Sequence, residues 1–239
     1  MQKILSLLRR CVEDYDMIAP GERVAVGVSG GKDSMVLLAA LARLAQFYPG
    51  GFSVEAFTVD MGTPGMDLSP LADYCRELGV PFHRIPTQMY HVIFETRREK
   101  NPCALCAKMR RGSLHTALLE AGIHKVALGH HYDDVIETIL MGMLWGAQVQ
   151  TMMPKLHSTN FEGMELIRPL YYVREDAIKA WRDCNGLHFI QCACKFTDTC
   201  TTCTNNETKS KRMEVKNLIR EMKKTNPGVE AHIFRSMEN

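Results

Sequence analysis

The chain has 239 residues, of which 46% are hydrophobic and 23% charged, and its formal net charge at pH 7 is +2. This length allows one sizeable domain with a substantial core. The small net charge excludes strong nonspecific attraction to nucleic acid, so any RNA binding must depend on local basic patches. No stretch resembles a membrane helix or a signal peptide, so we expect a cytoplasmic protein without a membrane partner. Nine cysteines in such a protein favour metal or redox chemistry over structural disulfides.

Apolar residues recur at helical spacing near the N-terminus, at Ile4, Leu7, Leu8 and Cys11. This spacing predicts an amphipathic helix over residues 2–17, and we take residues 1–20 as an N-terminal helical unit. Its apolar side suits either the protein core or the second subunit of a homodimer, and the sequence leaves both open.

Strand-like and helix-like segments alternate after this helix. Strands are expected at residues 24–28, 54–60, 81–85 and 125–129, and helices at 33–47, 68–78, 107–121 and 135–145. The alternation predicts the α/β class, with a Rossmann-like, doubly wound parallel sheet over residues 21–190. Ligands of such sheets bind beyond the carboxyl ends of the strands, near the point where the strand order reverses.

The chain is less regular after residue 148. We expect a short strand at 166–170, a helix starting near 174, a cysteine-rich stretch at 191–206, and a basic helix at 207–224 that ends before Asn226-Pro227-Gly228. Residues 191–239 are expected to form a cysteine-rich, helical C-terminal region packed on the same domain. The basic helix is either an RNA contact or an ordinary solvated surface.

The most informative motif is Ser29-Gly30-Gly31-Lys32-Asp33-Ser34, which follows an apolar, β-branched strand. Glycines allow backbone N–H groups to approach a phosphate, and the N-terminus of the following helix favours an anion. The motif is no Walker A loop, because Lys32 is followed by Asp33 rather than by Ser or Thr. We predict that this loop binds a phosphate group. The alternative is a plain glycine turn.

A second motif, Gly129-His130-His131-Tyr132-Asp133-Asp134, also joins a strand to a helix. Asp133 and Asp134 are predicted to hold Mg²⁺, which would bridge phosphate oxygens and neutralise charge that develops on them. Helix capping is the alternative, but it accounts for only one of the two carboxylates.

The cysteines distinguish between possible chemistries. Cys103 and Cys106 lie three residues apart where a helix is expected to begin, and Cys192, Cys194, Cys200 and Cys203 lie downstream. A four-thiolate Zn²⁺ site of Cys103, Cys106, Cys200 and Cys203 is one solution. A cubane cluster held by three cysteines is another, and it would leave one iron open to hydrosulfide. Cys11, Cys75 and Cys184 are expected to be core or surface thiols.

The first motif resembles the pyrophosphate loop (PP-loop) of ATP pyrophosphatases, the adenine nucleotide alpha hydrolase type, and the second resembles the second motif of that family. Between them stand Pro102-Cys-x-x-Cys106 and Arg110-Arg111-Gly112. After them come Ile167-Arg-Pro-Leu170, Tyr172-Val-Arg-Glu175 and Phe189-Ile-Gln-Cys192. This order resembles the tRNA 2-thiocytidine synthetases of the TtcA type, over roughly residues 20–239.

The resemblance implies an ATP-dependent sulfurtransferase that forms AMP and pyrophosphate. It implies that the first motif, from Ser29 to Ser34, binds ATP together with Gly129 and His130 of the second motif. It also implies that the catalytic residues are Lys32, Asp33, Asp133 and Asp134. The substrate of the enzyme would be the C2 carbonyl of an anticodon-loop cytidine, at position 32, and the sulfur would come from a donor protein or hydrosulfide. A 4Fe-4S cluster would be held by Cys103, Cys106 and Cys192, with Cys194 as the alternative third ligand. Thr58 and Asp60 would lie beside the adenosine.

Basic residues bracket the CxxC pair and are predicted to contact tRNA phosphates; they are Arg97, Arg98, Lys108, Arg110 and Arg111. Three other functions would explain part of this set of motifs. A persulfide-using thiolase needs exchangeable cysteines and no iron, and a lysidine-type or amidotransferase-like ligase needs no cysteine cluster. A zinc-stabilised nucleotide-binding or RNA-binding module would bind ATP without cleaving it.

Overall fold

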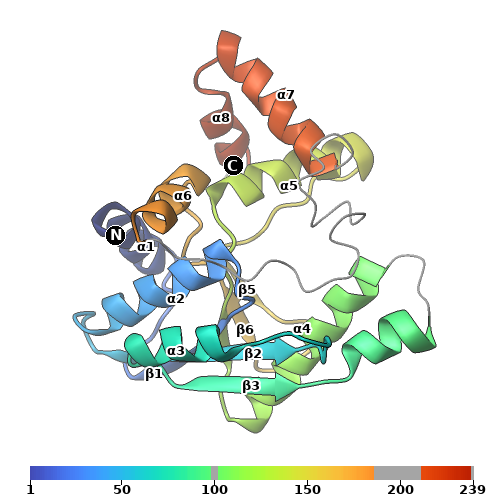
Figure 1. The fold of residues 1–239 in the computed structure, drawn as a ribbon. Coiled ribbons are helices and arrows are strands. Elements are labelled where there is room, and N and C mark those ends of the chain that lie inside the picture. Colours follow the sequence, from blue (N-terminus) through green and yellow to red (C-terminus); the bar gives the residue numbers. More distant parts are fainter. Residues whose placement is uncertain (98–101, 186–210, 238–239) are drawn as a thin grey trace.

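A six-stranded sheet forms the centre of the computed structural model, which describes residues 1–97, 102–185 and 211–237 (Figure 1). The spatial order of the strands is β3, β2, β1, β4, β6, β5. All neighbours are parallel except β5 and β6, which are antiparallel. The strands are β1 (Glu22–Gly27), β2 (Phe52–Asp60), β3 (Phe82–Pro86), β4 (Lys125–Ala127), β5 (Lys155–His157) and β6 (Glu165–Ile167).

The strand order reverses between β1 and β4. The chain passes from β1 to β2 and β3 on one side, and then returns to place β4 on the other side of β1. This is the predicted doubly wound topology, and it makes the carboxyl ends of β1 and β4 the expected ligand site.

Helices cover both faces of this sheet, and α7 and α8 pack on α5, away from the strands (Figure 1). The helices are α1 (Gln2–Asp14), α2 (Lys32–Ala45), α3 (Ser69–Glu77), α4 (Pro102–Glu120), α5 (Tyr132–Trp145), α6 (Glu175–Cys184), α7 (Lys211–Thr225) and α8 (Val229–Arg235), with one π-helical segment, η1 (His91–Thr96). No helix among the described residues has the length and apolar character needed to cross a membrane.

Several boundaries differ from the expected ones. Helix α4 begins at Pro102 rather than near residue 107, so both cysteines of the CxxC pair lie inside it. Strand β6 ends at Ile167, before Pro169, which has no N–H to donate to a ladder. Helix α7 ends at Thr225, before Asn226-Pro227-Gly228 as predicted, whereas residues 207–210 lie outside the described part of the chain.

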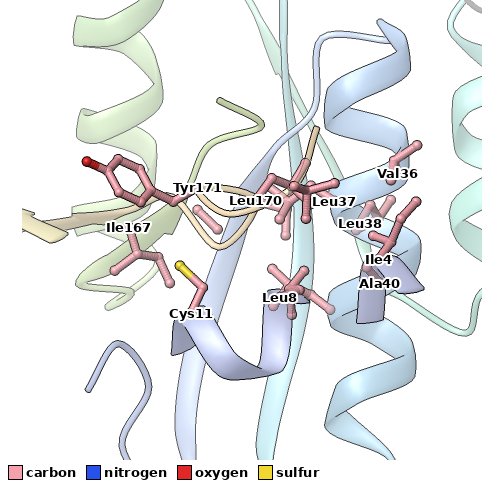
Figure 2. Packing of buried hydrophobic residues seen from close by; sticks show 14 of the residues in the cluster. Ile4, Leu8, Cys11, Val36, Leu37, Leu38, Ala40, Ile167, Leu170 and Tyr171 are labelled. Carbon is pink, nitrogen blue, oxygen red and sulfur yellow. The ribbon is translucent and has the colours of Figure 1, made fainter. Parts of the chain in front are cut away.

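The two faces of the sheet bury different side chains of the same strands. Val24 and Val26 belong to the larger core, which includes residues of α1, α2, α3, α5 and α6, whereas Ala25 packs in a smaller cluster with Leu118 of α4. Figure 2 shows the larger core, where Ile4, Leu8 and Cys11 of α1 lie against α2 and the segment around Leu170. The apolar side of the N-terminal helix therefore packs into the core of this chain.

The three described cysteines outside the CxxC pair, Cys11, Cys75 and Cys184, lie where core or surface thiols are expected. Cys11 and Cys75 are fully buried, and burial raises the pKa of their thiols to about 12 and about 11. Cys184 is exposed at the end of α6. Thiols held protonated in an apolar core are poor nucleophiles and poor metal ligands.

Candidate functional site

The two nucleotide motifs leave neighbouring strands, β1 and β4, at the same edge of the sheet. The first motif turns through Gly30, whose φ of 78° lies in the left-handed region that glycine tolerates. The Ser34 hydroxyl donates to the Gly31 carbonyl at 2.9 Å and accepts from the Ser29 N–H at 3.2 Å. These bonds close a tight loop on the N-terminus of α2, a geometry suited to an anion.

Backbone contact joins the second motif to this loop. A methyl group placed on Gly129 would stand 2.9 Å from the Asp33 carbonyl carbon and 2.9 Å from the Ser34 nitrogen. Real Cβ atoms essentially never approach other heavy atoms so closely. Only glycine therefore allows the two motifs to meet in this way.

A cavity of about 470 Å³ opens at this junction. Residues predicted from the sequence that line it are Ser29, Gly31, Asp33, Ser34, Gly129, His130, Asp134, Arg110 and Arg111. An apolar part of the lining was not expected from the sequence, and it comprises Phe57, Val59, Leu114, Leu128 and Leu166, together with His115. One wall is thus polar and suited to phosphates, and the other is suited to a planar base.

Thr58 and Asp60, predicted beside the adenosine, do not line the cavity and are held by internal bonds. The Thr58 hydroxyl donates to the Val28 carbonyl at 2.9 Å. The Asp60 carboxylate accepts from the Arg84 Nε at 2.7 Å and from the Gly62 N–H at 2.9 Å. Strand alternation explains this, because positions 57 and 59 face the side of the sheet opposite to positions 58 and 60.

The Lys32 ammonium is directed into ion pairs. It lies 2.9 Å from the Asp33 carboxylate and 3.2 Å from Glu175 at the start of α6. Burial raises the pKa of Glu175, but Lys32, Lys179 and Lys216 together lower it to about 2. Glu175 therefore remains anionic, and a phosphate must compete with it for Lys32.

The predicted pair Asp133 and Asp134 is divided between two environments. Asp133 lies 2.9 Å from Arg174 and accepts the Glu175 N–H at 2.7 Å, so it caps α6. Asp134 lines the cavity, accepts the His131 N–H at 3.0 Å and lies 2.8 Å from Arg212 of α7. Burial raises the pKa of Asp134, but His131 and Arg212 outweigh it and hold that pKa below its ordinary value.

Helix α4 carries the CxxC pair toward the same cavity. Ala107, Arg110, Arg111 and Leu114 of this helix line the cavity, and Cys103 lies one turn before Ala107 on the same face. The Cys106 sulfur lies 3.8 Å from the Met61 sulfur, beside a small apolar cluster. No three metal-binding side chains gather within the described ranges, and the predicted ligands Cys192 and Cys194 lie outside those ranges, as do Cys200 and Cys203.

The structure describes four of the five residues that are predicted to contact RNA. Arg97, Lys108, Arg110 and Arg111 are exposed, whereas Arg98 lies outside the described residues. Much of the positive charge of α7 is paired inside the protein: Arg212 with Asp134, Lys216 with Glu137 and Glu175, and Lys223 with Glu230. These cations fasten α7 to α5, α6 and α8.

Comparison with known proteins agrees with this geometry. The PP-loop domain family matches residues 2–220. The tRNA-cytidine(32) 2-sulfurtransferase of Geobacter sulfurreducens is 36% identical over 239 residues, which are 100% of this chain and 90% of that protein. Its namesake from Anaeromyxobacter dehalogenans is 34% identical over 237 residues, 99% of this chain and 78% of that protein.

A solved structure shows the same fold. The U34-tRNA thiolase NcsA from Methanococcus maripaludis, with its 4Fe-4S cluster, aligns at a TM-score of 0.77 and 23% identity, over 99% of this chain and 78% of that one. The motifs, their meeting at one cavity and the curated relatives agree. This chain belongs to the PP-loop family and, within it, to the tRNA-cytidine(32) 2-sulfurtransferases.

Proposed function

We propose that this enzyme uses ATP to replace the C2 oxygen of an anticodon-loop cytidine in tRNA, at position 32, with sulfur. Two observations support the proposal. The curated relatives bear the name of this activity and match nearly the whole chain. In addition, one cavity is lined by both nucleotide motifs and by α4, the helix that carries Cys103 and Cys106.

The proposed reaction has two steps that balance without an oxidant or reductant. The C2 carbonyl oxygen attacks the α-phosphorus of ATP, the bond to the β-phosphate oxygen breaks, and pyrophosphate leaves. Hydrosulfide, or a donor that delivers sulfur at the same oxidation level, then attacks C2. The C2–O bond breaks, AMP leaves, and the proton of the hydrosulfide is lost.

The residues of this chain have defined tasks in this proposal. The backbone N–H groups of the Ser29–Ser34 loop and the N-terminus of α2 bind the phosphates that leave as pyrophosphate. Lys32 leaves its ion pair with Glu175 and pairs with these phosphates instead. The apolar wall formed by Phe57, Val59 and Leu128 receives the adenine and limits access of water.

Mg²⁺ fits one part of the predicted carboxylate pair. Asp33 and Asp134 both line the cavity and offer the oxygen ligands that Mg²⁺ prefers. Asp133 pairs with Arg174 and caps the N-terminus of α6, so it must leave these partners to bind the ion. When bound, Mg²⁺ would neutralise charge that develops on the leaving pyrophosphate.

An iron–sulfur cluster fits the chemistry of α4. Cys103 and Cys106 are both half-buried, and they lie in the first turns of the helix, where its dipole favours thiolates. They would supply two of the three ligands, with Cys192 or Cys194 as the third. When bound, such a cluster offers an iron without a protein ligand, on which sulfur can be delivered.

RNA is proposed to approach along the exposed face of α4. Arg110 and Arg111 line the cavity mouth, where they would contact phosphates flanking the reactive base. A base in a duplex could not enter the cavity, so the substrate must present an unstacked nucleotide, as an anticodon loop does.

Anaerobic purification with metal analysis and nucleoside analysis of tRNA tests the proposal. The wild-type protein should carry about four irons with broad absorption near ~400 nm, and tRNA incubated with ATP and sulfide should gain 2-thiocytidine with release of pyrophosphate. Cys103→Ser and Cys106→Ser should lose iron and thiolation. Cys184→Ser is the matched control and should keep both, because Cys184 lies on α6 away from the cavity.

The alternatives give different results. Stoichiometric zinc without iron, combined with ATP binding but no pyrophosphate release, would identify a zinc-stabilised binding module. Thiolation by an iron-free protein would identify a persulfide-using enzyme. Pyrophosphate release with incorporation of an amine and no sulfur would identify a ligase.

A further inference from the structure

Arg168, which the proposed reaction does not use, is buried beside the cavity. It follows β6 directly, and β6 pairs in parallel with β4, so the carboxyl ends of both strands meet at one edge. This arrangement brings Arg168 to His130, three residues beyond the end of β4. The Arg168 Nε donates to the His130 Nδ1 at 3.3 Å, and its Nη1 donates to the Met153 carbonyl.

This hydrogen bond determines which nitrogen of His130 carries the proton. A guanidinium only donates, so the His130 Nδ1 must offer its lone pair, and in the neutral ring the hydrogen then resides on Nε2. His130 lines the cavity, and its Nε2 has no hydrogen-bond partner among the described residues. The ring therefore keeps one N–H donor for a ligand.

The other charged groups near His130 act in different directions. Asp134 of α5 favours a proton on the ring, whereas Arg168, Arg212 of α7 and the neighbouring His131 oppose it. Burial is the largest influence, Arg168 is the next, and together they lower the pKa of His130 to about 4. Burial also lowers the pKa of Arg168, to about 10, so Arg168 remains a cation at neutral pH.

We propose that Arg168 is a positioning residue that holds His130 as a neutral Nε2–H donor toward a phosphoryl oxygen of the bound nucleotide. The cavity supports this target, because His130 lines it together with Ser29, Gly31 and Ser34 of the phosphate loop. A neutral donor binds the phosphoryl oxygen without adding a charge that changes with pH. The choice of ligand rests on the proposed function, whereas the tautomer does not.

Nuclear magnetic resonance of ¹⁵N-histidine in the full chain reads the tautomer directly, with His130→Gln to assign the signal. The wild-type ring should show Nε2–H and Nδ1 lone-pair shifts that stay constant between about pH 5.5 and 8.5, a range that spans the ordinary histidine pKa. In Arg168→Met, the ring should lose the single tautomer and titrate at a higher pH. Its ATP dissociation constant should rise about tenfold, the size expected for one lost hydrogen bond.

The control is Arg23→Met. Arg23 also donates to a backbone carbonyl, that of Ala121 at 3.0 Å, and pairs with Glu55, but it lies at the opposite end of β1. This variant should leave both the His130 shifts and the ATP affinity unchanged. An Nδ1–H tautomer in the wild type, or wild-type titration of His130 near the ordinary pKa, would overturn the proposal. So would an unchanged spectrum in folded Arg168→Met.

The wild-type spectrum alone decides the tautomer if Arg168→Met does not fold. A lack of tRNA thiolation would refute the proposed function but leave this result intact, because neither RNA nor sulfur is present in the measurement. Unchanged ATP affinity with the expected spectral change would refute the phosphoryl contact alone.

Discussion

Replacing Gly129 by alanine tests whether the two nucleotide motifs meet as described. The new methyl group would stand 2.9 Å from two backbone atoms of Asp33 and Ser34, and 3.0 Å from the Asp33 oxygen. Since ordinary contact begins at 3.4 Å, the N-terminus of α2 must move by about half an ångström. Backbone cannot rotate away as a side chain would, so we expect a loss of about 1–3 kcal/mol in the free energy of unfolding.

The same displacement should impair nucleotide binding. Because the phosphate loop is continuous with the start of α2, moving it misaligns the donors of Ser29, Gly31 and Ser34, and we expect ATP to bind at least about tenfold more weakly. Urea denaturation gives the stability, and isothermal titration calorimetry gives the affinity.

Gly112→Ala is the matched control. Gly112 lies inside α4 with open space around its Cα, so the added methyl group should stabilise the helix by about 1 kcal/mol. Two chemically identical substitutions should thus have opposite effects on stability. If Gly129→Ala were as stable as the wild type and bound ATP equally well, the close approach of the motifs would be wrong.

Three further predictions concern charge. Burial raises the pKa of Glu137 to about 7, so the contribution of this group to stability should grow as the pH falls from about 7 toward 4.5, while the lowered pKa of His130 acts in the opposite direction. The urea midpoint of the wild type should therefore rise relative to that of Glu137→Gln over this pH range, and a constant difference between the two proteins would refute the assignment. Lys125→Met should cost about 3–5 kcal/mol in thermal or urea denaturation, because it strips two carboxylates of a buried partner. Arg110→Ala and Arg111→Ala should weaken tRNA binding and flatten its salt dependence, whereas the exposed Arg76→Ala should change neither; equal slopes would refute the RNA contact.

Features formed by residues close together in the chain could be predicted from the sequence, whereas contacts between distant residues could not. The tight turn of the Ser29–Ser34 loop was predictable because its glycines and serines interact within six residues. The family resemblance implies that Thr58 and Asp60 lie beside the adenosine, and this stays a prediction. The alternation of the strand, which is visible in the sequence, indicates that Phe57 and Val59 face the cavity.

The partners of the motif residues were not predictable. Glu175 reaches Lys32 from 143 positions away in the chain, and Arg168 reaches His130 across a strand pairing that no local pattern encodes. Strand β5 has only three residues and an exposed Leu156, so it carries no apolar alternation to recognise. The third cluster ligand stays a prediction, since Cys192 and Cys194 lie outside the described residues.

The internal pairing of α7 has a consequence for how RNA is selected. Four of its cations, Arg212, Lys216, Lys223 and Lys224, are neutralised by carboxylates of the same chain. A cation that is already paired gains little from a phosphate, so these side chains should form few of the phosphate contacts that release the counterions condensed on RNA, each of which changes the slope of log affinity against log salt by about −0.7 to −0.9. Nonspecific RNA gains little from this surface. In the proposed function, discrimination would then depend on the exposed cations of α4, Arg110 and Arg111, which line the same cavity as the two nucleotide motifs.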